Sequence, residues 1–204
     1  MSSLIGNLAP DFIATAILHD NAIQKDFTLS TFLKGKKGVL FFYPLNFTFV
    51  CPSEIIAFDN TLQEFRKRNT EIIGISVDSH HAHVAYKNQH IQDGGIGKVK
   101  YPLLSDLNKN IAKKYNVLHS SSVALRATFL IDEDFYIRHQ LVNDLPIGRN
   151  VYDLIRVIDA LSHHQKYGDV CPANWQSGQE AISPNIPGLK KYLRNQYVTI
   201  SNLT

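Results

Sequence analysis

The feature that most constrains the fold is a repeated order of short apolar runs and helix-length segments in the first half of the chain. Residues 39–43, VLFFY, form an aromatic-rich run that stops at Pro44, which predicts a buried strand. Residues 71–77, EIIGISV, predict a second strand. The segment 53–68 between them carries apolar residues at spacings of three and four, namely Ile55, Phe58, Leu62 and Phe65. Strand, helix and strand in this order predict a crossover that joins two parallel strands.

The pattern continues with a predicted helix over 82–89 and a short helix that Asp106 would cap, carrying Leu107 and Ile111. Residues 127–131 and 135–139 flank an acidic turn and predict a β-hairpin, and a last long helix is predicted over 151–164. After Tyr167, Gly, Pro, Asn and Ser become frequent, which predicts an arm that leaves the core. Several α/β folds share this order of elements.

Length and composition exclude several classes of protein. A chain of 204 residues suits one main core, and 44% hydrophobic with 19% charged residues is typical of an ordinary globular protein. No apolar run approaches the roughly 20 residues of a membrane span. The N-terminus lacks the pattern of a secretory signal, so a cytoplasmic location is expected. A net charge of +3 with scattered basic residues argues against a nucleic-acid partner.

The two cysteines, Cys51 and Cys171, lie far apart in the sequence, which excludes a CxxC motif and paired zinc-ligand spacing. His80, His81 and His83 form a cluster that invites a metal interpretation, but no second cluster has ligand spacing. We therefore expect exposed histidines at the start of a helix and no metal site.

Cys51 follows a predicted strand and precedes Pro52, a residue that helices accept only near their first turn. The free N–H groups and the dipole of a helix start favour an anion, and a thiolate is one. The hydroxyl of Thr48 would then lie next to the sulfur, and Pro44 would shield it from water. The alternative is that Cys51 is a small, inert core residue.

The combination Pro-x-x-x-Thr-x-x-Cys at a strand-to-helix junction favours the reactive interpretation, because it matches the active-site motif of the peroxiredoxins. Further stretches carry the same match: ISVDSHHAHVAYKN, YPLLSD, RATFLIDED, DLPIGRN and GDVCPANW. From about residue 4 to 195 the chain resembles a typical 2-Cys peroxiredoxin of the alkyl hydroperoxide reductase C type.

The resemblance implies an α/β, thioredoxin-like fold, with a central mixed β-sheet flanked by helices and an N-terminal extension. Residues 1–165 would form the peroxidase domain, and residues 166–204 a C-terminal arm with the resolving cysteine. It also implies a site with peroxidatic Cys51, resolving Cys171, pocket residues Thr48, Pro44 and Arg126, and the supporting pair Glu54 and Arg149.

The implied activity is the reduction of hydrogen peroxide and organic hydroperoxides without a cofactor or metal. Cys51 would become a sulfenic acid, Cys171 of the partner subunit would form a disulfide with it, and a dithiol donor would recycle both. Thioredoxin or a flavoprotein disulfide reductase would be that donor. The expected assembly is a homodimer within a ring of five dimers.

Two alternatives remain open at this stage: a holdase chaperone or redox relay, and a one-cysteine peroxidase in which Cys171 is incidental. The chain also departs from its relatives at four places. Asn46 replaces an aspartate, Tyr86 replaces a tryptophan, residues 94–97 read GGIG instead of GGLG, and Tyr192-Leu193 replaces a Tyr-Phe pair.

Overall fold

The structure, a computed structural model, describes residues 3–201 and the side chains of residues 3–196. The chain divides into two compact units, one up to Val151 and one from Tyr152 onward. The predicted boundary between residues 165 and 166 concerns function and stays a prediction.

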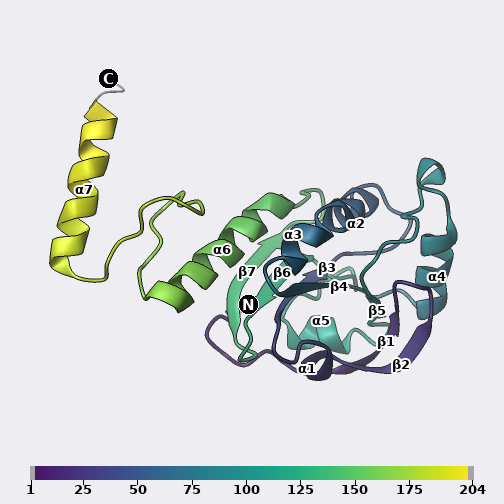
Figure 1. The fold of residues 1–204 in the computed structure, drawn as a ribbon. Helices are drawn as coiled ribbons and strands as arrows, with labels where there is room; N and C mark the ends of the chain where they lie inside the picture. Colours follow the sequence, from purple (N-terminus) through teal and green to yellow (C-terminus); the bar gives the residue numbers. More distant parts are fainter. Residues whose placement is uncertain (1–2, 202–204) are drawn as a thin grey trace. The chain divides into compact units, whose positions relative to one another are not determined.

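The first unit contains a seven-stranded sheet (Figure 1) with the order β2-β1-β5-β4-β3-β6-β7. Its strands are β1 (Ile13–Ile17), β2 (Ile23–Thr28), β3 (Lys37–Phe42), β4 (Thr70–Ser76), β5 (Leu103–Ser105), β6 (Arg126–Ile131) and β7 (Ile137–Asn143). The pairs β3–β4 and β4–β5 are parallel, and the other neighbours are antiparallel. The sheet is therefore mixed, as predicted.

Helices cover both faces of this sheet. They are α1 (Leu29–Phe32), α2 (Cys51–Asn60), α3 (Leu62–Arg66), α4 (His80–Asn88) and α5 (Asn110–Lys114), with a 3₁₀ turn at Ile91–Asp93. Figure 1 shows α2 and α3 on one side of the strands and α1 and α5 on the other. This is the α/β arrangement that the sequence predicts.

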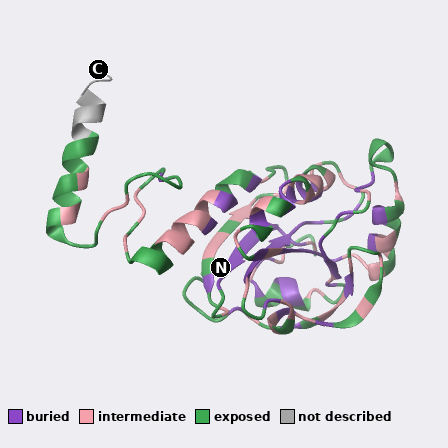
Figure 2. Cartoon of the chain, viewed as in Figure 1, coloured by how far each residue is buried: buried purple, intermediate pink, exposed green. Residues whose placement is uncertain are grey.

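The core is built on β3, whose six residues are all buried (Figure 2). Successive side chains point to opposite faces: Phe41 stacks on Phe58 of α2 with ring centroids 4.3 Å apart, and Phe42 lies 5.4 Å from the ring of Tyr115 after α5. A strand covered on both faces favours apolar residues at successive positions, which explains the uninterrupted run over 39–43 in the sequence.

Two local expectations need correction. The helix predicted over 53–68 is two helices that meet at Thr61, whose hydroxyl donates to the Ala57 carbonyl at 2.8 Å. Asp106 does cap α5, by accepting the N–H groups of Ile111 and Ala112, but Leu107 is exposed and precedes the helix. The predicted N-terminal extension contributes strands to the sheet, with β1 between β2 and β5.

The second unit holds α6 (Val151–Tyr167) except for its first residue, α7 (Ile186–Ser201) and the segment between them. That segment is ordered by the bridge between Val170 and Ile182 and by Trp175, which is buried and donates from Nε1 to the Gln179 carbonyl. Within the described part of the chain, every helix is too short or too polar to cross a membrane.

Candidate active site

Cys51 is the first residue of α2, as predicted, and its side chain is fully buried. The loop from Tyr43 to Val50 connects the end of β3 to this position. Pro52 lies in the first turn of α2, where the missing backbone N–H of proline costs nothing. The thiol therefore lies at the positive end of the helix dipole, in a place shielded from water.

Arg126, the first residue of β6, faces this sulfur. Its Nη1 lies 3.4 Å from Cys51 Sγ and 2.7 Å from Glu54 Oε2, and its Nε donates to the Leu145 carbonyl at 2.6 Å. Three acceptors thus fix the plane of the guanidinium group. A cationic donor aimed at sulfur forms a stronger hydrogen bond to a thiolate than to a thiol.

Glu54 and Arg149 hold the guanidinium group of Arg126 in place. Arg149 binds Glu54 through two parallel bonds, Nε to Oε1 and Nη2 to Oε2, both 2.8 Å long. Its Nη1 donates to the carbonyls of Phe42 and Ala127, also at 2.8 Å. The buried carboxylate is thereby shared by two guanidinium groups, so that one positive charge remains in excess beside the thiol.

Pro44 and Thr48 both lie in the loop before Cys51. Pro44 is buried, and Thr48 is half-buried with its hydroxyl donating to the Leu45 carbonyl at 3.0 Å. The predicted approach of the Thr48 hydroxyl to the sulfur stays a prediction. The structure brings together Cys51, Glu54, Arg126 and Arg149, which come from three separate stretches of the first unit.

Cys171 belongs to the second unit, where it is half-buried and lies 3.6 Å from the Ala160 carbonyl. Burial raises the pKa of its thiol, and the carboxylate of Asp169 raises it further. Both cysteines are free thiols. The resolving role of Cys171 stays a prediction.

The histidine cluster differs from the expectation of exposed side chains. His81 is exposed, but His83 is fully buried and is hydrogen-bonded to the Asn46 side chain and the Leu104 carbonyl. In the described residues no group of three potential ligands is arranged to hold a metal ion. The sequence contained one signal for this burial: His83 lies three positions before Tyr86, on one face of α4.

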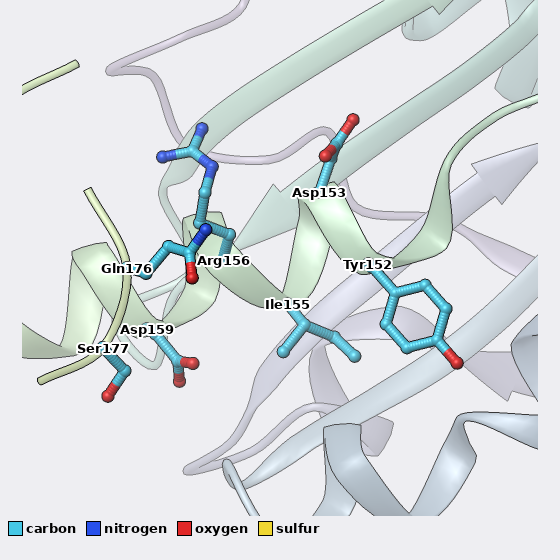
Figure 3. A pocket seen from close by; sticks show the side chains of 7 residues that line it. All are labelled: Tyr152, Asp153, Ile155, Arg156, Asp159, Gln176 and Ser177. Carbon is cyan, nitrogen blue, oxygen red and sulfur yellow. The ribbon is translucent and has the colours of Figure 1, made fainter. Parts of the chain in front are cut away.

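A separate surface hollow of about 380 Å³ lies in the second unit (Figure 3). It is lined by Tyr152, Asp153, Ile155, Arg156, Asp159, Gln176 and Ser177. Its lining contains neither cysteine, and sequence reasoning had not singled it out.

Comparison with known proteins agrees with this fold and site. Residues 5–140 match the AhpC/TSA family, and residues 160–194 match the family described as the C-terminal domain of 1-Cys peroxiredoxin. Alkyl hydroperoxide reductase C of Buchnera aphidicola subsp. Schizaphis graminum is 50% identical over 196 residues, which cover 96% of this chain and 99% of the relative. Peroxiredoxin-1 of Gallus gallus is 47% identical over 95% of this chain and 97% of its own length.

Solved structures give the same result. The reduced 2-Cys peroxiredoxin of Plasmodium vivax superposes with a TM-score of 0.92 at 50% identity, covering 95% of this chain and all of that one. The mitochondrial 2-Cys peroxiredoxin of Plasmodium falciparum gives a TM-score of 0.78 at 49% identity, covering 83% of this chain and all of that one.

These matches define the class of the protein, an oxidoreductase with the thioredoxin-like fold of the peroxiredoxins. The chain belongs to the AhpC/TSA family. It is therefore an enzyme, a thiol-dependent peroxidase, as the sequence predicts.

Proposed function

We propose that the protein reduces hydrogen peroxide and organic hydroperoxides through Cys51. The observation that carries this proposal is the contact of the Arg126 guanidinium with the buried Cys51 sulfur at the start of α2. The names of the relatives, alkyl hydroperoxide reductase C and peroxiredoxin, support the same substrate class.

In the proposed reaction the Cys51 thiolate attacks one oxygen of ROOH, the O–O bond breaks, and the other oxygen leaves with a proton as ROH. Arg126 stabilises the charge that moves along the O–O bond, and Thr48 would hold the peroxide. Cys51 becomes a sulfenic acid. The thiol of Cys171 from the partner subunit then displaces water to form a disulfide, and an external dithiol is oxidised to restore both thiols.

The proposed assembly is a homodimer within a ring of five dimers. Oligomers occur among the structural neighbours: a Plasmodium yoelii Prx1a modified at its N-terminus is described as an artifactual octamer. Thioredoxin or a flavoprotein disulfide reductase is the proposed donor, and a cytoplasmic location is proposed. Residues 1–165 would act as the peroxidase domain, and residues 166–204 as the arm that brings Cys171 to the partner.

Peroxide consumption by the wild type and two variants tests this function. Cys51→Ser should abolish turnover, because an alcohol ionises far less readily than a thiol and forms no sulfenic acid. Cys171→Ser should keep one rapid turnover and lose donor-dependent cycling. Full cycling in the Cys51→Ser variant would refute the function, and full cycling in Cys171→Ser would favour a one-cysteine mechanism.

A non-reducing gel tests the pairing. Peroxide-treated wild type should run at about twice the 23.0 kDa of the chain, and either serine variant should lose this band. A dimer band that persists in both variants would show that the pairing is misassigned.

A further inference from the structure

A closed hydrogen-bond network lies beneath the loop that leads to Cys51. The hydroxyl of Tyr43 donates to Asn46 Oδ1 at 2.9 Å, and Asn46 Nδ2 lies 3.1 Å from His83 Nδ1. On the other side of the ring, His83 Nε2 lies 3.1 Å from the Leu104 carbonyl. Tyr43, Asn46 and His83 are all buried, so each polar atom depends on its partner in the network.

The partners of His83 determine where its proton lies. The Leu104 carbonyl can only accept, so Nε2 must carry the hydrogen; the Asn46 amide nitrogen can only donate, so Nδ1 must accept. Tyr43 Oη, 3.3 Å from Nδ1, is a second possible donor to the same atom. The network is therefore complete only around a neutral imidazole in a single tautomer.

The charges around His83 agree with a neutral ring. Burial is the main reason that the pKa of His83 is lowered to about 4. The carboxylate of Asp78 opposes this effect, and His80 and Lys87, on the same helix, add to it. Tyr43, which also faces the ring, has a pKa raised by burial and stays neutral.

The network holds a strained part of the loop. The backbone N–H of Asn46 donates to Asp78 Oδ2 at 2.8 Å, so both its main chain and its side chain are fixed. The next residue, Phe47, has a left-handed backbone with φ 55°, and its ring packs 4.5 Å from that of Tyr86 on α4. A non-glycine residue keeps such a conformation only while its surroundings enforce it.

We propose that Asn46 and His83 are positioning residues for Cys51, because they fix the loop between Pro44 and the start of α2 on helix α4, and that this requires a neutral His83. Neither residue contacts the sulfur. The inference rests on the proposed peroxidase function and adds a condition on its geometry.

The proposal predicts an effect of the residue type at position 46. With asparagine, His83 stays neutral between pH 6 and 9, so the loop is held equally across this range. In Asn46→Asp the carboxylate favours the imidazolium form, and the bond between residues 46 and 83 then needs a proton on Nδ1. Once the pH rises above the raised pKa of His83 in this variant, Nδ1 loses its proton. Nδ1 and the carboxylate at position 46 are then two acceptors that face each other, and the loop is released.

Stopped-flow measurement of the first reaction of reduced protein with hydrogen peroxide tests this between pH 6 and 9. The ratio of the Asn46→Asp rate constant to the wild-type value should fall about fivefold or more as pH rises. Dividing by the wild-type value removes the pH dependence that the two proteins have in common. A ratio independent of pH would overturn the proposal.

A second pair of variants separates the hydrogen bonds from the volume of the ring. Gln in His83→Gln can accept with Oε1 and donate with Nε2, and this variant should keep most of the rate; His83→Phe should lose about tenfold. His81→Phe, at an exposed position of the same helix, is the matched control and should behave as the wild type. Circular dichroism confirms that each variant is folded, and equal rates for His83→Gln and His83→Phe would contradict the proposal.

Hydrogen–deuterium exchange at the histidine C2 position, read by mass spectrometry, gives the pKa of His83 without any activity. It should be far below 6.5 in the wild type and higher in Asn46→Asp. A wild-type value near 6.5 would refute the network. A wild type that consumes no peroxide would instead refute the proposed function, so the two failures are distinguishable.

Discussion

At the scale of single residues, the site depends on a carboxylate placed between two arginines. Glu54 is buried, and an unpaired carboxylate there would be strongly unfavourable. Its bonds to Arg126 and Arg149 offset the cost of burying the charge. They also hold the guanidinium group of Arg126 beside the sulfur of Cys51. The orientation of this one guanidinium group is therefore set by the whole cluster.

Arg126→Lys should for this reason lower the rate constant of Cys51 with peroxide by at least about tenfold. An ammonium group keeps the charge, but it cannot bind the Leu145 carbonyl, Glu54 and the sulfur with the geometry of a planar fork. Stopped-flow single-turnover kinetics measure the effect. Arg68→Lys, in a surface ion pair with Glu64, is the control, and equal rates for the two variants would show that fork geometry is unimportant.

Lys87 gives a pH dependence of stability. It is almost fully buried with Nζ donating to the Leu18 carbonyl, and burial lowers its pKa to about 8. The unfolded chain keeps the ordinary value near 10.4. Below pH 8 Lys87 is charged in both the folded and the unfolded state, and the cost of burying the charge lowers stability in full. Between about pH 8 and 10.4 Lys87 is neutral in the folded state but still charged in the unfolded state. This cost is therefore relieved as the pH rises.

The free energy of unfolding of the wild type should therefore rise relative to that of Lys87→Met across this window, by roughly 2 kcal/mol. Urea titrations at one protein concentration measure the difference at each pH, and taking the difference cancels the tyrosines that titrate in the same range. A constant difference from pH 7 to 10.5 would mean that Lys87 ionises as it does in water.

At the scale of elements, the loop after α4 depends on Gly95. A Cβ atom at this position would lie 2.2 Å from the Gln89 carbonyl oxygen, which is backbone and cannot rotate away. Gly95→Ala should lower the free energy of unfolding by roughly 1–3 kcal/mol. Thermal unfolding measures this, with Gln92→Ala at an exposed position of the same loop as control. Equal melting temperatures for the two variants would contradict the close approach.

The sequence predicted well those strands whose position in the fold leaves one clear pattern of apolar residues. Strands β3 and β4 are covered on both faces and read as apolar runs. Strands β1 and β2 carry mixed burial, with Lys25 and Asp26 in β2, so no periodic pattern reveals them. The break between α2 and α3 comes from the hydroxyl of Thr61 bonding back to Ala57, which apolar spacing does not register.

The candidate site was predictable to different degrees. Cys51 and Glu54 are three residues apart at a helix start, so local pattern alone places them on one face. Arg126 and Arg149 reach them through the pairing of distant strands and loops, and only the family resemblance named them. The Asn46–His83 network was missed because polarity suggested exposure for a histidine that the fold buries.

At the scale of the whole molecule, the proposed disulfide requires α2 to unwind at its first turn. A disulfide needs sulfur atoms about 2 Å apart, and Cys51 is fully buried at the start of a helix. The rate of this local unfolding decides how long the sulfenic acid persists. A longer wait lets a second peroxide oxidise it to the sulfinic acid.

The family resemblance implies that a GGLG loop and a Tyr-Phe pair cover the helix of the peroxidatic cysteine in sensitive relatives. This chain has Ile96, buried, in the loop, and Tyr192-Leu193 in α7. Exchange of leucine for isoleucine is mild, whereas loss of an aromatic ring removes a large apolar surface. We therefore expect sensitivity to over-oxidation between that of sensitive and robust relatives.

Mass spectrometry of Cys51 during turnover at increasing peroxide measures the sulfinic fraction. Leu193→Phe should raise this fraction, because it restores the aromatic ring of the cover that the family resemblance implies. Truncation before Pro187 should lower it, because it removes most of α7. Arg194→Lys, at an exposed position of the same helix, controls for general effects. If Leu193→Phe and the truncation both left the sulfinic fraction at the wild-type value, the C-terminal helix would not act as a cover.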